Sequence, residues 1–205
     1  MEIEFTRMGI VFMHLIACCV AIGLVVTSDI AMLKQLFRAD PNERFDPHHL
    51  SDLQKTVSHS LLALWVTGAA IVTLDASLKG WGYFANPKLQ SKVAIVMLLT
   101  MNGYALHKYV LPALQKAGSL LRLSFGQRRL ALFTGAVSGV SWFYAAMLGI
   151  GRPLNWKYSL VQIMAAYPVL IAGGFACMAL LTVWSQSRAG GENEEAREPR
   201  LASPH

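Results

Sequence analysis

Residues 91–111 read SKVAIVMLLTMNGYALHKYVL, and this stretch decides the fold class. No other charged residue lies between Lys92 and His107, and most positions between them are apolar. A helix needs about 20 mainly apolar residues to cross the hydrocarbon core of a bilayer. The stretch therefore predicts a membrane-spanning helix with an ionisable side chain near each end.

The rest of the chain repeats this pattern. Only 15% of the 205 residues are charged, whereas about a quarter are charged in soluble domains. Nothing alternates like the strands of a membrane barrel. We predict an all-α, polytopic membrane helical bundle: residues 1–185 form a five-helix transmembrane domain, and residues 186–205 form a disordered polar tail. The expected spans are 8–33, 57–78, 92–114, 130–150 and 159–184.

The basic residues predict how the bundle is oriented. The first loop, the third loop and the tail together hold twelve Lys and Arg residues, against six at the N-terminus and in the other two loops. Cytoplasmic loops carry the excess of positive charge. We therefore expect the N-terminus outside, the C-terminus in the cytoplasm and a multi-pass location in a bacterial inner membrane. The net charge of +6 is accounted for in this way and does not indicate nucleic-acid binding.

Four ionisable side chains are predicted to lie inside the spans and sort into two pairs by depth. His14 and Lys92 lie toward the outer side, while His59 and His107 lie toward the inner side. Ionisable groups at membrane depth are costly and usually functional. Taken singly, each histidine is also explained by a hydrogen bond between helices, and the lysine by a side chain that reaches the membrane surface.

Helical periodicity places these residues on faces rich in small side chains. At about 100° per residue, Lys92, Gly103 and His107 share one face of the third span. Small residues allow close packing of membrane helices, and they also leave room for a flat macrocycle. Asp29 and Asp75 lie near span ends, where we expect them to contact interfacial water or helix ends.

Two segments, MHLIACCVAIGLVVTSDIAMLKQL and LQSKVAIVMLLTMNGYALHKYV, resemble the HemJ-type membrane protoporphyrinogen oxidases and the related copper-resistance D-like membrane proteins. The resemblance covers roughly the first three spans. In the HemJ type, a first-helix histidine precedes an apolar run, and a later helix opens with lysine. The resemblance implies that His14 and Lys92 correspond to the residues tied to a b-type haem in that family.

These observations together predict a b-type haem protein that acts in transmembrane electron transfer or as a membrane oxidoreductase. His59 and His107 would form a bis-histidine site suited to electron transfer. His14 would hold an outer haem, and Lys92 would either ligate iron as the neutral amine or hold a haem propionate by charge. One haem and two haems both fit, with the Gly103 face as the corridor between two of them. The expected partners are the lipid bilayer, a quinone or other redox partner, and a second copy or a larger membrane complex.

Two other functions fit the same chain. Nine methionines and three cysteines offer soft ligands for Cu(I), and Met97 and Met101 lie one turn apart, so a copper-handling protein is one alternative. The second is a structural subunit of a membrane complex, because the fourth span carries small residues suited to helix packing. An absorbance spectrum separates the haem protein from both alternatives.

Overall fold

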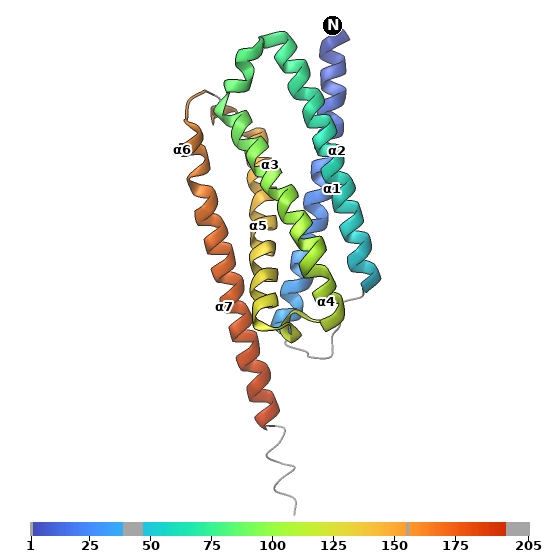
Figure 1. Ribbon diagram of the computed structural model, residues 1–205, viewed down its shortest axis with the longest axis vertical. Helices are drawn as coiled ribbons and strands as arrows, with labels where there is room; N and C mark the ends of the chain where they lie inside the picture. Colours follow the sequence, from blue (N-terminus) through green and yellow to red (C-terminus); the bar gives the residue numbers. More distant parts are fainter. Residues whose placement is uncertain (1, 39–46, 155, 196–205) are drawn as a thin grey trace, which may run out of the picture.

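The computed structural model describes residues 2–38, 47–154 and 156–195, and within them it contains only helices and the turns between them. Five helical segments are long and apolar enough to cross a membrane, as the sequence predicts. The chain is therefore a multi-pass membrane protein. Because five is odd, the described chain starts at one end of the bundle and finishes at the other (Figure 1).

The five spans are built from seven α-helices and short helical turns. The first two spans are α1 (Glu2–Arg38) and α2 (Pro47–Lys79). The third combines α3 (Pro87–Ala105), a π-helical turn (Leu106–Val110) and α4 (Leu111–Ala117). The fourth is α5 (Phe125–Ile150), and the fifth combines α6 (Leu160–Met164) with α7 (Ala166–Glu195). Short 3-10 turns lie in the connections, at Trp81–Ala85, Leu120–Arg122 and Arg152–Leu154.

Helix α5 is the centre of the bundle. In its most apolar window 44% of residues are buried, against at most 22% in the other spans. It packs on α3 and α7, and more lightly on α1, whereas α2 packs mainly on α1 (Figure 1). The small residues predicted for helix packing lie here, and Gly174 of α7 faces Ala136 and Val140. Contacts within the chain therefore account for part of the stripe that favoured a structural subunit.

Local sequence signals set several helix ends. Asn86 caps α3 by accepting a hydrogen bond from the Lys88 backbone N–H, with proline at the first helical position. Ser124 and Gln127 form a capping box at the start of α5. Gly118 ends α4 at φ 72°, a left-handed conformation that favours glycine. These signals set the start of α3, the end of α4 and the start of α5.

The third span contains a π-helical turn that its sequence explains. Pro112 has no N–H to donate to the carbonyl of Lys108, and its ring crowds that carbonyl. The chain widens by one residue instead, and the Leu111 N–H bonds the carbonyl of Leu106. His107 lies inside this turn, so the turn sets the direction of its imidazole.

The fifth span begins at its predicted limit, but it is interrupted internally and extends beyond its predicted end. The helix is interrupted at Ala165, three residues before Pro168, as a proline in a helix leads one to expect. Beyond Trp184, where the hydrophobic run stops, α7 continues to Glu195. Ser185 is buried and donates a 2.6 Å hydrogen bond to the Leu36 carbonyl of α1, which ties this extension to the bundle. The predicted tail therefore begins as helix, and residues 196–205 lie outside the described part.

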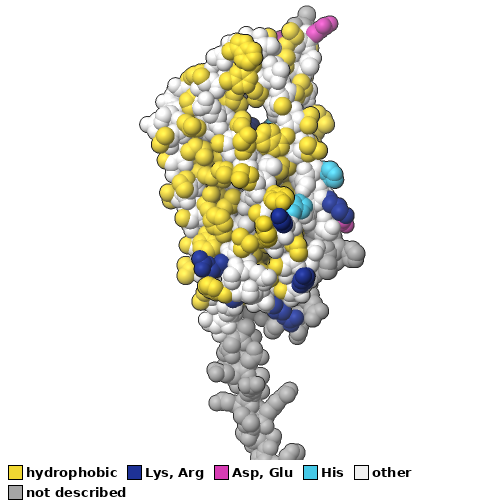
Figure 2. Space-filling model, viewed as in Figure 1, with side chains coloured by type: hydrophobic (Ala, Val, Ile, Leu, Met, Phe, Trp, Pro, Cys, Tyr) yellow, Lys and Arg dark blue, Asp and Glu magenta, His cyan; other side chains and the backbone are white. Residues whose placement is uncertain are grey.

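The two ends of the bundle differ in charge. Figure 2 shows apolar side chains over most of the visible face, with Lys and Arg gathered toward the end opposite the N-terminus. We call this end, where Lys55, Lys108, Arg129 and Arg188 lie, the basic end. The opposite end carries Glu2 and Glu4.

Candidate functional site: a histidine and a lysine between helices

His14 of α1 is held by a chain of two hydrogen bonds on α2. Its Nδ1 lies 2.8 Å from Thr67 Oγ1, and the Thr67 hydroxyl donates to the Ala63 carbonyl at 2.6 Å. A hydroxyl has one proton to donate, so His14 Nδ1 must be the donor to Thr67. Nε2 then carries the lone pair and is the nitrogen available to a metal.

Small residues surround this imidazole. Gly68 lies directly beside it, because a Cβ built on that glycine would lie 3.5 Å from His14 Cε1. One and two turns along α1, Ala17 and Ala21 are buried against α2 and α3. A larger side chain at position 68 would press on the ring and change its angle.

Lys92 of α3 approaches the same region from the other side. Its side chain lies near His14 and near Cys18, which is one turn further along α1. Its Nζ also lies against α5, 3.8 Å from where a Gly149 Cβ would be. No hydrogen bond or ion pair engages Lys92 within the described residues. An ammonium group without a partner inside a membrane bundle indicates a place for an anionic partner.

The predicted inner pair is placed differently. His107 Nε2 lies 3.0 Å from Gln54 Nε2 and 3.1 Å from Ser58 Oγ, both on α2. The Gln54 amide donates, so the lone pair of His107 Nε2 is already used. This histidine is in the interhelical hydrogen-bonding role that competes with metal ligation.

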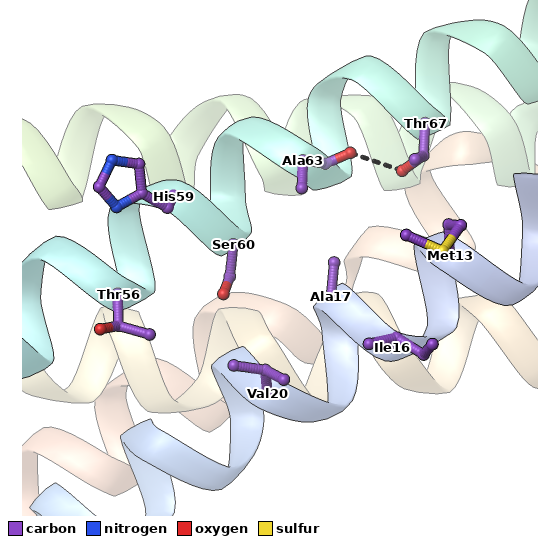
Figure 3. A pocket seen from close by; sticks show the side chains of 9 residues that line it. All are labelled: Met13, Ile16, Ala17, Val20, Thr56, His59, Ser60, Ala63 and Thr67. Atoms are coloured by element: carbon purple, nitrogen blue, oxygen red, sulfur yellow. Dashed lines mark hydrogen bonds between the residues drawn. The ribbon is translucent and has the colours of Figure 1, made fainter.

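His59 faces another part of the molecule. It is exposed and lines a groove between α1 and α2, whose volume is about 350 Å³. Figure 3 shows its ring at the rim on the α2 side, whereas Ser60 points toward α1. Within the described residues, no hydrogen bond engages the His59 imidazole or joins it to His107. The two inner histidines therefore meet different neighbours.

The remaining predicted groups make fewer contacts. Around Gly103 a Cβ would meet nothing within 4 Å, so no neighbouring helix requires a glycine there. Met97 and Met101 are exposed on the lipid-facing surface, as are Cys19 and Cys177. Among the described residues no three His, Cys, Asp or Glu side chains gather as metal ligands.

An ion-pair network at the N-terminal end of the bundle was not foreseen from the sequence. Asp75 is buried rather than exposed to interfacial water, and it accepts hydrogen bonds from Arg7 Nε at 2.8 Å and Lys79 Nζ at 2.9 Å. Lys79 also lies over the Tyr83 ring. Burial, together with the Asp75 charge, raises the pKa of the Tyr83 phenol. The network joins α1, α2 and the loop after α2.

Thr67 is a residue of the candidate site that the sequence analysis did not identify. It lies eight residues after His59 on α2, the helix for which the sequence analysis considered only His59 as a candidate ligand. A threonine inside a helix usually donates to the carbonyl four residues earlier, so its sequence gives no sign of a second partner. Only the position of α1 against α2 shows that its oxygen also accepts from His14.

Comparisons with family models, with curated proteins and with solved structures find no match for this chain.

Proposed function

We propose that this membrane protein binds one b-type haem between α1, α3 and α5 and uses it for electron transfer. The observation that carries the proposal is the 2.8 Å contact between His14 Nδ1 and a Thr67 hydroxyl that already donates to the Ala63 carbonyl. From it we infer that Nδ1 carries the proton and that Nε2 keeps its lone pair. Metal-binding histidines typically donate their second nitrogen in this way, which fixes the ring and raises its basicity. Haem, when bound, supplies a one-electron redox couple.

His14 and Lys92 fit the two polar requirements of a haem. His14 would hold the iron through Nε2, and the Lys92 ammonium would hold a propionate carboxylate. Both groups lack competing partners within the described residues. Gly68 lets α2 approach the imidazole closely, because a Cβ at this position would lie 3.5 Å from His14 Cε1. Lys92 has an alternative role, in which its neutral amine ligates the iron. That role predicts a low-spin spectrum in the wild type, and Lys92→Arg would change it to a high-spin spectrum because the ligand is lost.

The geometry favours one haem over two. A second haem at His107 would have to displace the bonds from Gln54 and Ser58. The copper alternative has less support, because Met97 and Met101 face outward. The basic end is proposed to lie in the cytoplasm, with the N-terminus outside, in a bacterial inner membrane.

Haem content of purified variants tests the site. We expect His14→Ala to lose most haem, measured as pyridine haemochrome per chain, and Lys92→Ala to bind it more weakly. His107→Ala is the matched control, a histidine in a neighbouring span whose nitrogen is already bonded, and it should keep full haem content. Equal loss in His14→Ala and His107→Ala would contradict the assignment of the ligand.

A further inference from the structure

The groove between α1 and α2 has an uneven distribution of polar groups. Its α1 wall is entirely apolar, and all of its polar side chains lie on α2 (Figure 3). The apolar wall consists of Met13, Ile16, Ala17 and Val20. On α2, Thr56, His59 and Ser60 lie toward the basic end, followed by Ala63 and then Thr67. The polar end therefore lies toward one membrane surface and the apolar wall extends toward the bilayer centre.

Two of these polar groups lack partners. Ser60 is only 8% exposed and points into the groove, yet no described residue forms a hydrogen bond with its hydroxyl (Figure 3). The same is true of the His59 imidazole at the rim. By contrast, the hydroxyls of Thr56 and Thr67 donate to the carbonyls of Asp52 and Ala63. The Ser60 hydroxyl is therefore available to hydrogen-bond a ligand that enters the groove.

Charge narrows the class of ligand. The groove is lined by no Lys, Arg, Asp or Glu among the described residues, so nothing in it would pair with the phosphate of a phospholipid. Ser60 and His59 each offer a hydrogen bond to a neutral oxygen. The groove opens on exposed, lipid-facing residues such as Val20, so its ligand enters from the membrane. These features fit an amphiphile with a neutral head that accepts hydrogen bonds and a long apolar tail.

The groove is also connected to the proposed haem site. Thr67 lines the groove and, through the same hydroxyl oxygen, accepts the hydrogen bond of His14. Ser60 and Thr67 are two helical turns apart, about 10 Å along α2. A redox-active head beside Ser60 would therefore lie close to a cofactor held by His14.

We propose that this groove binds an isoprenoid quinone, with a carbonyl oxygen of its head bonded by Ser60 and His59 and its tail lying along Ile16 and Met13. The choice of a quinone over other neutral lipids rests on the proposed electron-transfer function. Binding itself does not require haem, so the groove can be tested separately.

The test is photoaffinity labelling of the full chain in phosphatidylcholine nanodiscs. The probe is a benzoquinone that carries an azide and a decyl tail, and mass spectrometry locates its adducts. We expect adducts in peptides covering residues 13–20 and 56–67, and we expect decyl-benzoquinone to compete for them. Adducts spread evenly over lipid-facing helices would overturn the proposal, as would equal competition by a short-chain phospholipid.

Three variants sharpen the result. Ser60→Ala should weaken labelling by about fivefold to tenfold, the value of one hydrogen bond, while leaving thermal stability unchanged, because its hydroxyl bonds nothing within the described protein. Val20→Trp fills the groove from an exposed position and should abolish labelling. Val11→Trp, an exposed α1 position outside the groove lining, is the control and should label normally. Normal labelling of Val20→Trp would contradict the site.

The outcomes separate this inference from the proposed function. Haem bound by His14 without specific quinone labelling rejects the quinone site and leaves the haem site standing. Specific labelling of a protein that binds no haem rejects the electron-transfer function and leaves the groove as a quinone site.

Discussion

Replacing Thr67 by valine should weaken haem binding without touching the haem ligand. Valine has nearly the same shape as threonine but has no hydroxyl, so His14 Nδ1–H loses its acceptor at 2.8 Å. The imidazole can then turn, and both of its tautomers become accessible. Loss of a partner that orients a metal ligand typically weakens binding by about 10–100-fold. At about 1.4 kcal/mol per factor of ten, this is about 1.4–2.8 kcal/mol.

The assay is a hemin titration of the haem-free protein in detergent, followed by the growth of the Soret band. Thr73→Val is the matched control, because Thr73 donates to the Ala69 carbonyl at 2.8 Å on the same helix but has no histidine partner. We expect an unchanged dissociation constant for Thr73→Val and the full increase for Thr67→Val. Thr67→Ser should restore most of the affinity, because it restores the acceptor. If both valine variants bind hemin equally well, the argument from the tautomer is wrong.

Three further predictions concern the fold. Asp75→Asn removes the negative charge that pairs with two partly exposed cations. We expect the free energy of unfolding to fall by about 1–2 kcal/mol, measured by thermal unfolding followed by circular dichroism. An unchanged melting temperature would show that the network does not stabilise the fold. Pro112→Ala should let the π-helical turn relax to α-helix, giving slower amide exchange around His107 in hydrogen–deuterium exchange, and unchanged exchange would mean that another feature causes the turn. Tyr167→Phe removes a buried hydrogen bond to the Ser141 hydroxyl of α5 and should lower the free energy of unfolding by about 0.5–1.5 kcal/mol. Equal stability of the variant in detergent unfolding would contradict the role of that hydroxyl.

The last of these predictions rests on a polar contact between α5 and α7. Tyr167 Oη lies 2.8 Å from the buried Ser141 Oγ, and its ring packs edge-on against Tyr144. Tyr144 in turn donates to the Ile163 carbonyl just before the helix interruption. These bonds hold the break in the fifth span in place, so the loss of one should be measurable.

The number and order of the spans could be predicted from hydrophobic patterning because lipid imposes it. A helix that crosses the bilayer must be long and apolar, and the sequence alone contains this information. The positions of the helix ends were harder to predict from the sequence. Residues 185–195 are polar, so the hydrophobic pattern stops at Trp184, but backbone hydrogen bonds and the contact between Ser185 and Leu36 allow α7 to continue.

The candidate site was predicted in part. Depth placed His14 and Lys92 toward the same end of the bundle, and the structure places the lysine side chain near that histidine. The same reasoning matched His59 with His107 by depth. Sequence reasoning could not predict in which direction the His107 imidazole points from its helix. The reason is that the π-helical turn before Pro112 adds one residue to the helical repeat at His107. Periodicity fails at such a turn, and the partners of the two histidines follow from packing instead.

The most direct test of the central claim is the reduced-minus-oxidised visible spectrum of the purified full-length protein, supplied with hemin and freed of excess. The account predicts a b-type spectrum with close to one haem per chain by pyridine haemochrome, present in the wild type and absent in His14→Ala. A correctly folded wild-type protein that stays colourless after this treatment would contradict it.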